Sequence, residues 1–191
     1  MSLIIACRTF YDKWVLLADS CYTAAGEQLT SQGEKLRYLE KGWLLGSVGY
    51  DTAEYLLLRD LDYERITDPL YHKERWKIIR QNTDGDPHLD GNWILTRESA
   101  CYVLNGSGEF WPVHGMWETC GRGELLANYL LLKAWPGRDP KPVEEILTLG
   151  QRVITEVSKS FIGVTLPVQW AISEPPNAVN TANTPNNYSD P

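Results

Sequence analysis

The side chains that most often carry catalysis or metal binding are sparse in this sequence of 191 residues. The three histidines fall in different predicted elements and nominate no Ser-His-Asp triad. Neither they nor the four cysteines show the spacing of a zinc site. We therefore expect no bound metal and no cofactor. The histidines are His72, His88 and His114, and the cysteines are Cys7, Cys21, Cys101 and Cys120.

Two short segments have the chemistry to bind an ion. Within Asp84–Gly91, the residues from Asp86 onward resemble the start of a calcium loop, but the twelfth position counted from Asp86 is Arg97, where a bidentate Glu is needed. We interpret it as a solvated acidic loop. Gly121-Arg122-Gly123 precedes a predicted helix, whose free amides and dipole favour an anion at that end.

The composition is that of one globular domain. The hydrophobic fraction is 43% and the charged fraction 23%, which excludes disordered and fibrous chains. A net charge of −7 argues against nucleic acid as a partner, and no apolar run is long enough to span a membrane. Because Leu3–Cys7 is too short for a secretory signal, we expect a cytoplasmic protein with free thiols. Eight Trp and ten Tyr against three Phe indicate a core with polar edges, subunit contacts or a substrate cleft.

The expected elements form blocks of strands and helices, which favours an α+β fold over a doubly wound sheet. Asp51 is a plausible N-cap of the first helix. The Pro- and Asn-rich segment 174–191 predicts a flexible tail, so the domain should comprise residues 1–173. The predicted strands are Leu3–Arg8, Trp14–Ala18, Lys35–Leu39, Trp43–Val48, Asn92–Thr96, Ala100–Leu104, Glu109–Val113 and Val168–Ile172, and the predicted helices are Thr52–Leu61, Leu70–Arg80, Gly123–Trp135 and Pro142–Ser158.

Several motifs occur in an order that resembles the proteasome β-subunit family, including the bacterial ATP-dependent double-ring peptidase. The resemblance covers roughly residues 2–173 and implies a four-layer αββα sandwich, the N-terminal-nucleophile hydrolase fold. Its pieces are Ser2–Arg8, Leu16–Ser20, Lys35 sixteen residues after Asp19, Leu45–Gly49, Cys101–Gly108 and Thr119–Gly123.

The resemblance implies a peptidase that acts through Ser2 after Met1 has been removed. Ser2 would be the nucleophile and would also supply its α-amine as the base, since a hydroxyl needs a base to take its proton. Lys35 would tune that amine, Asp19 would orient Lys35, and the amide of Gly46 would stabilise the oxyanion. The implied substrate-binding residues are Cys21, Ser47, Gly49 and Arg122.

The same family implies a homo-oligomeric ring that binds a peptide substrate and is fed by an ATP-dependent unfoldase or cap. Three departures favour a catalytically silent homologue that serves as an assembly or binding scaffold. Ser2 replaces the usual Thr, Arg122 replaces a Ser, and the family's later Asp and Ser have no match better than Ser160. A non-peptidase amidohydrolase with the same nucleophile is a third reading.

Outside the resemblance, the same residues have simpler explanations. Asp19 follows a predicted strand and would serve as a turn residue, and Lys35 would be a solvated charge. Gly46 would only permit close packing of strands.

Overall fold

A computed structural model describes residues 2–20, 22–24, 27–29, 34–49, 51–83, 89–137, 139–161 and 163–173. The predicted tail at 174–191 lies outside these residues, and so does Cys21. Most of the predicted acidic loop, residues 84–88, also lies outside them.

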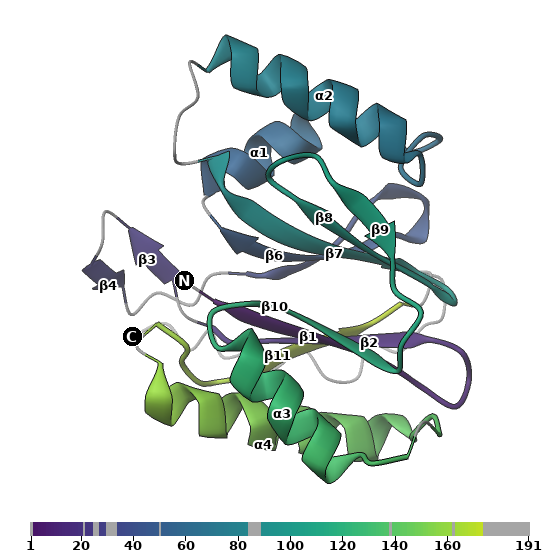
Figure 1. Ribbon diagram of the computed structural model, residues 1–191, viewed down its shortest axis with the longest axis vertical. Helices are drawn as coiled ribbons and strands as arrows, with labels where there is room; N and C mark the ends of the chain where they lie inside the picture. Colours follow the sequence, from purple (N-terminus) through teal and green to yellow (C-terminus); the bar gives the residue numbers. More distant parts are fainter. Residues whose placement is uncertain are drawn as a thin grey trace, which may run out of the picture.

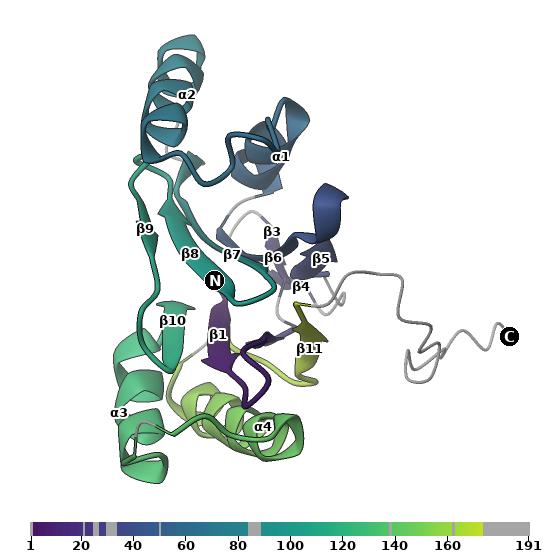
Figure 2. The same ribbon diagram turned by 90° about the vertical axis from the view of Figure 1, so that its right-hand side faces the viewer.

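The described residues form four layers (Figure 1). Two antiparallel sheets face each other, α1 and α2 cover the outer side of one, and α3 and α4 cover the outer side of the other (Figure 2). The predicted α+β, four-layer αββα sandwich is confirmed. The first sheet has the order β10 (Trp117–Gly121), β1 (Leu3–Arg8), β2 (Trp14–Ala18) and β11 (Gln169–Ile172). The second has the order β5 (Leu36–Tyr38), β6 (Leu44–Gly49), β7 (Gly91–Arg97), β8 (Ala100–Asn105) and β9 (Phe110–Pro112).

The remaining elements are short or helical. A separate hairpin joins β3 (Tyr22–Ala24) and β4 (Glu27–Leu29), and a 3-10 turn covers Glu40–Gly42. The helices are α1 (Asp51–Arg59), α2 (Pro69–Asn82), α3 (Glu124–Ala134) and α4 (Val143–Ser160). Within the described residues, none of these helices is both long and apolar enough to cross a membrane.

Strand β1 is buried on both faces, which explains its nearly continuous apolar sequence. Leu3 and Ile5 pack toward α3 and α4, whereas Ile4 and Ala6 pack into the core between the two sheets. Successive side chains of a strand point to opposite faces, so a strand with a core on each side has no polar face. The start of the chain is thereby held in the middle of the sandwich.

The structure differs from the sequence-based expectation at three places. Strand β10 was not expected, because Glu118 and Gly121 interrupt its apolar pattern; antiparallel pairing with β1 makes it a strand. The hairpin of β3 and β4 was also not expected. Asp51 is the first residue of α1 and not its N-cap.

The tryptophan excess belongs mainly to the core. Five of the eight are at most 3% exposed, namely Trp14, Trp43, Trp76, Trp93 and Trp135. Trp111 on the edge strand β9 is 40% exposed, and Trp170 on the edge strand β11 is 46% exposed. These two are exposed on the surface of the chain.

Candidate active site

Three residues named from the sequence converge where the two sheets meet. The Lys35 Nζ atom lies 2.5 Å from Ser2 Oγ and 3.0 Å from Asp19 Oδ1. Ser2, Asp19 and Lys35 are 6%, 0% and 7% exposed. This burial excludes the simpler explanation of Lys35 as a solvated charge, because a lysine is rarely buried without a partner.

The sheet register places Asp19 beside Ser2. Antiparallel pairing of Ile4 with Ala18 sets the end of β2 next to the start of β1. The Leu3 amide donates to Asp19 Oδ1 at 2.8 Å, and the Asp19 amide donates to the Leu3 carbonyl at 3.2 Å. Asp19 is therefore fixed by the same strand pair that fixes the nucleophile candidate.

Two residues that the sequence did not nominate also hold the cluster. The Thr165 amide donates to Asp19 Oδ2 at 3.3 Å, and the Lys35 amide donates to the Gln169 Oε1 atom at 3.1 Å. Thr165 contributes only backbone, which leaves no side-chain signal in the sequence. Gln169 lies in a predicted strand, and nothing local marks its side chain as facing Lys35. Ser160, the nearest candidate for the family's later Ser, is exposed at the end of α4.

The turn between β10 and α3 contacts the backbone of Ser2 and fixes its position. The Arg122 amide donates to the Ser2 carbonyl at 2.8 Å. Gly121 has a φ of +106°, and a Cβ atom there would lie 2.1 Å from the same carbonyl oxygen. Only glycine fits this position, because a side chain there would collide with the backbone of Ser2.

The β6 residues named from the sequence, Gly46, Ser47 and Gly49, differ in the direction of their backbone amides relative to Lys35. The Ser47 amide donates to the Lys35 carbonyl at 2.9 Å. Because amides alternate along an antiparallel strand, the Gly46 amide points to the other neighbour, where its partner is Ile94. A Cβ atom on Gly46 would lie 3.1 Å from Ile4, which supports its role in close packing between the sheets.

Gly49 ends β6, two residues after Ser47, whose amide faces Lys35. By the alternation that turns the Ser47 amide toward Lys35, the Gly49 amide points the same way. Gly49 is exposed, its φ is +147°, and a Cβ atom there would lie 2.7 Å from the Asp90 carbonyl oxygen. The position requires glycine and leaves its amide accessible.

The cysteines of the described residues are unsuited to be nucleophiles. Burial raises the pKa of Cys7 and of Cys120 to about 12, and burial likewise raises the pKa of Cys101. A thiol attacks as its thiolate, so these groups are inert near neutral pH. In the described part of the chain, no three His, Cys, Asp or Glu side chains gather in a way that could hold a metal.

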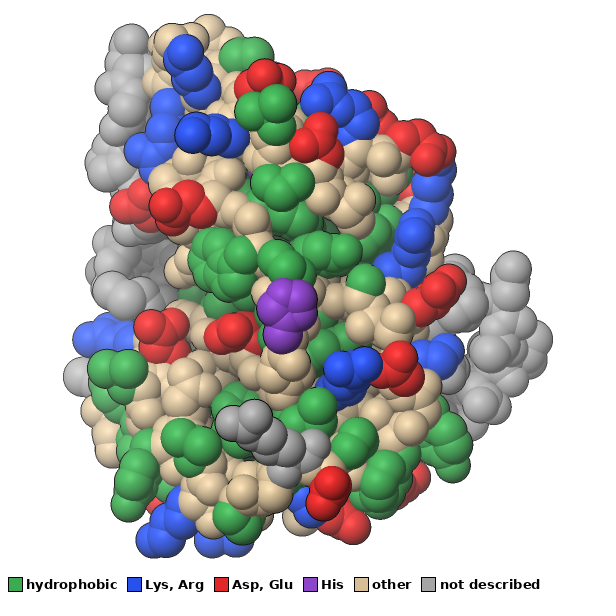
Figure 3. Space-filling view, turned by 45° about the vertical axis from the view of Figure 1, so that its right-hand side comes forward, with side chains coloured by type: hydrophobic (Ala, Val, Ile, Leu, Met, Phe, Trp, Pro, Cys, Tyr) green, Lys and Arg blue, Asp and Glu red, His purple; other side chains and the backbone are tan. Residues whose placement is uncertain are grey.

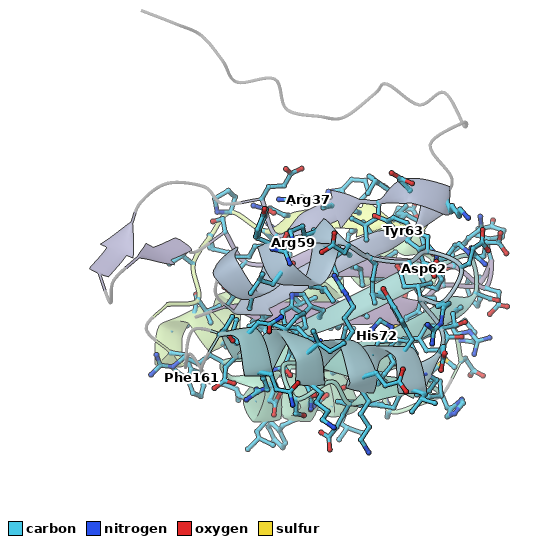
Figure 4. The ribbon with its side chains drawn as sticks, turned by 90° about the horizontal axis from the view of Figure 1, so that it is seen from above. Arg37, Arg59, Asp62, Tyr63, His72 and Phe161 are labelled. Atoms are coloured by element: carbon cyan, nitrogen blue, oxygen red, sulfur yellow. The ribbon has the colours of Figure 1, made fainter. Side chains whose placement is uncertain are left out.

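The buried histidine, His72, contacts residues outside this cluster. His72 lies on α2, seen from above in Figure 4, and its Nε2 atom is 2.7 Å from the Ile66 carbonyl oxygen. Its ring stacks on Phe110 with centroids 4.5 Å apart, and desolvation lowers its pKa. It therefore belongs to the packing of α2 on the second sheet.

Comparison with known proteins identifies the fold. No protein-family model and no curated protein sequence matches the chain. Among solved structures, Anbu (ancestral beta-subunit) from Yersinia bercovieri matches with a TM-score of 0.70 at 14% identity, over 89% of this chain and 80% of that one. HslV from Trypanosoma brucei matches with a TM-score of 0.66 at 16% identity, over 89% and 98% of the two chains.

A third structure is BPH from Thiobacillus denitrificans in complex with epoxomicin. It matches with a TM-score of 0.64 at 12% identity, over 89% of this chain and 97% of that one. These identities are low, so the likeness concerns the fold. The resemblance to the proteasome β-subunit family is confirmed at that level: the chain has the proteasome-like N-terminal-nucleophile hydrolase fold.

Proposed function

We propose that this chain is a proteasome-like N-terminal-nucleophile peptidase that acts through Ser2 after Met1 has been removed. The observation that carries the proposal is the buried contact of Lys35 Nζ with both Ser2 Oγ and Asp19 Oδ1, at 2.5 and 3.0 Å. A hydroxyl, an ammonium and a carboxylate held together without solvent are suited to activating a nucleophile.

The reaction would begin with attack of Ser2 Oγ on the carbonyl carbon of an amide. The hydroxyl proton would pass to the α-amine of Ser2, the only strong base that removal of Met1 creates there. The ammonium of Lys35 disfavours a second positive charge on that amine and so keeps it free to accept the proton. Collapse of the tetrahedral intermediate would break the C–N bond, return the proton to the leaving amine and leave an ester on Ser2. Water would then hydrolyse the ester.

The geometry favours Gly49 over Gly46 as the oxyanion donor. The Gly46 amide belongs to the ladder with β7, whereas Gly49 is exposed and its amide faces the side of Lys35. An amide can stabilise an oxyanion only when no carbonyl already occupies it. We therefore assign the oxyanion to the Gly49 amide and keep Gly46 as the residue that lets the sheets approach.

We propose further that the chain is a cytoplasmic homo-oligomer, in line with the expected ring, that cleaves peptides fed by an ATP-dependent unfoldase or cap. The free cysteines support a reducing compartment. Association is supported by α3, whose Leu125, Tyr129 and Leu132 are 81%, 59% and 60% exposed at helical spacing. Such a stripe favours contact with another subunit. Size-exclusion chromatography with light scattering tests this, because a particle of one chain's mass contradicts it.

Intact-mass spectrometry and two electrophiles test the nucleophile. The purified protein should lack Met1, and a β-lactone should acylate the Ser2 hydroxyl. Epoxomicin, which BPH binds, is an epoxyketone that needs both a hydroxyl and a free α-amine to close its ring adduct. It should therefore add mass at Ser2 only in the processed chain.

Paired variants make the result specific. Ser2→Ala should abolish both adducts and peptide hydrolysis, whereas Ser99→Ala, at an exposed turn between β7 and β8, should abolish neither. Retention of Met1, or hydrolysis that survives Ser2→Ala, would refute the mechanism. An intact oligomer without any adduct would instead favour the catalytically silent scaffold, the reading that Arg122 in place of the family's Ser supports.

A further inference from the structure

Arg122 carries an exposed charge at a position paired with the candidate nucleophile Ser2, and no described residue pairs with that charge. Its side chain is exposed, and among the described residues its guanidinium makes neither an ion pair nor a hydrogen bond. Acidic side chains are close in sequence, since Glu118 and Glu124 flank it, yet neither pairs with it in this part of the structure. The charge is therefore free to bind a group from outside the chain.

Most other arginines of the described residues are engaged. Arg8, Arg37, Arg59, Arg65 and Arg80 form ion pairs. Arg75 donates to the carbonyls of Leu56 and Leu57, and Arg97 lies over the Trp43 ring. Acidic and basic side chains also lie close together on the face in Figure 3. Within the described chain, Arg152 on α4 shares with Arg122 the lack of such a contact.

The position of Arg122 costs stability locally. It lies two residues before Glu124, the first residue of α3, where the helix dipole presents its positive end and disfavours a cation. Its backbone amide bonds the Ser2 carbonyl at 2.8 Å, so the two Cα atoms are about 5.5 Å apart, as in any such pair. An arginine side chain is long enough to span that distance. A group bound next to Ser2 can therefore come within its reach.

We propose that Arg122 binds a carboxylate of the substrate next to the amide bond that is cleaved, so that the preferred substrates are acidic peptides. This rests on the proposed function, because it assigns the substrate class of the same site. A guanidinium recognises a carboxylate through two parallel hydrogen bonds. The nearest other cation, Lys35, is already held by Asp19. A chain of net charge −7 repels acidic peptides in general, so their selection needs a local cation.

Matched peptides test the preference by hydrolysis. A peptide whose scissile bond has been mapped by mass spectrometry is prepared with Glu, Gln or Lys on either side of that bond in turn. At one of the two positions, Glu should exceed Gln by about tenfold in kcat/KM, mainly through KM, as expected for one charged contact at an exposed site. Arg122→Gln should remove the preference, Arg122→Lys should keep part of it, and Arg122→Glu should favour Lys.

A binding assay separates this inference from the peptidase proposal. The Ser2→Ala chain is titrated with dye-labelled Ala-Ala-Glu-Ala-Ala and its Gln counterpart, and anisotropy gives the two dissociation constants. A Glu preference that Arg122→Gln removes supports the inference even if no variant hydrolyses any peptide. The control Arg152→Gln makes the same change of charge at an exposed site and should keep the preference. Equal affinity for both peptides, or a preference that survives Arg122→Gln, overturns it.

Discussion

Replacing one partner of the buried pair Asp19–Lys35 should destabilise the protein far more than breaking a surface ion pair. Unit charges 3.0 Å apart attract by 332/(20 × 3.0), about 5.5 kcal/mol, at an effective dielectric constant of about 20. Both groups are desolvated, which offsets much of this while they are paired. Asp19→Asn leaves the ammonium buried without its counter-charge, and the expected loss is about 4 kcal/mol of unfolding free energy.

Replacing Lys35 should lower the unfolding free energy by less than replacing Asp19, and the two losses should not be additive. After Lys35→Met, Asp19 keeps the amides of Leu3 and Thr165 as donors, so we expect a loss of about 3 kcal/mol. The double variant leaves no lone charge. It should be about 2–3 kcal/mol more stable than the sum of the two single losses predicts.

Urea denaturation of the four proteins, followed by circular dichroism, measures these differences. As a control, Glu156→Gln breaks the exposed pair with Lys159, 2.6 Å long, and should cost less than about 1 kcal/mol. A loss below 1 kcal/mol for Asp19→Asn, together with additive single losses, would refute the buried pair and the activation scheme built on it. If Asp19→Asn does not fold, Lys35→Met alone still tests the magnitude.

Three further predictions concern Gly121 beside the site, the buried thiol of Cys120 and the buried ring of His72. Gly121→Ala should lower kcat/KM by at least a hundredfold and reduce the Tm, because its Cβ atom would lie 2.1 Å from the Ser2 carbonyl oxygen; Gly137→Ala, whose nearest contact is 3.7 Å, should change neither. Cys120 should resist iodoacetamide at pH 8 in the native protein and react after unfolding, since its pKa is raised to about 12; labelling of the native thiol would contradict its burial. His72 has a lowered pKa, so the unfolded chain binds more protons as pH falls below about 6.5. The native state should thus lose stability between pH 7.5 and 5, and His72→Phe should show a smaller drop in Tm over that range; an equal drop would exclude His72 as the cause.

The sequence predicted the fold well where local pattern and tertiary packing agree. Strand β2 has the bounds Trp14–Ala18 that the sequence predicts, because a short apolar run next to a turn segment is typical of a strand. The start of α2 at Pro69 fits the local signals too, since the Asp68 side chain accepts the Leu70 amide as an N-cap. Strand β10 was not predicted, because it is stabilised by hydrogen bonds with β1, which is far away in the sequence.

For the site, the sequence order suggested which residues belong together, but not their orientation. Ser2, Asp19 and Lys35 come together because each lies at the end of a strand, and the ordered motifs predicted where those strands begin and end. The direction of the Gly46 and Gly49 amides depends on the register between β5 and β6, and a shift of one residue would exchange them. The contact of Gln169 with Lys35 could not be predicted either, because it depends on how the two sheets pack against each other.

Strand β1 is made well before its neighbour β10 and before β11, the last strand of its sheet. Gln169 and Lys35 are 134 residues apart, so at about 5–20 residues per second Gln169 is added roughly 7–27 s after Lys35. Pairing over such separations also slows folding itself. The hydrogen bond between the Lys35 amide and Gln169 can therefore form only after β11 has been made, so the cluster of Ser2, Asp19 and Lys35 gains its support from that strand last.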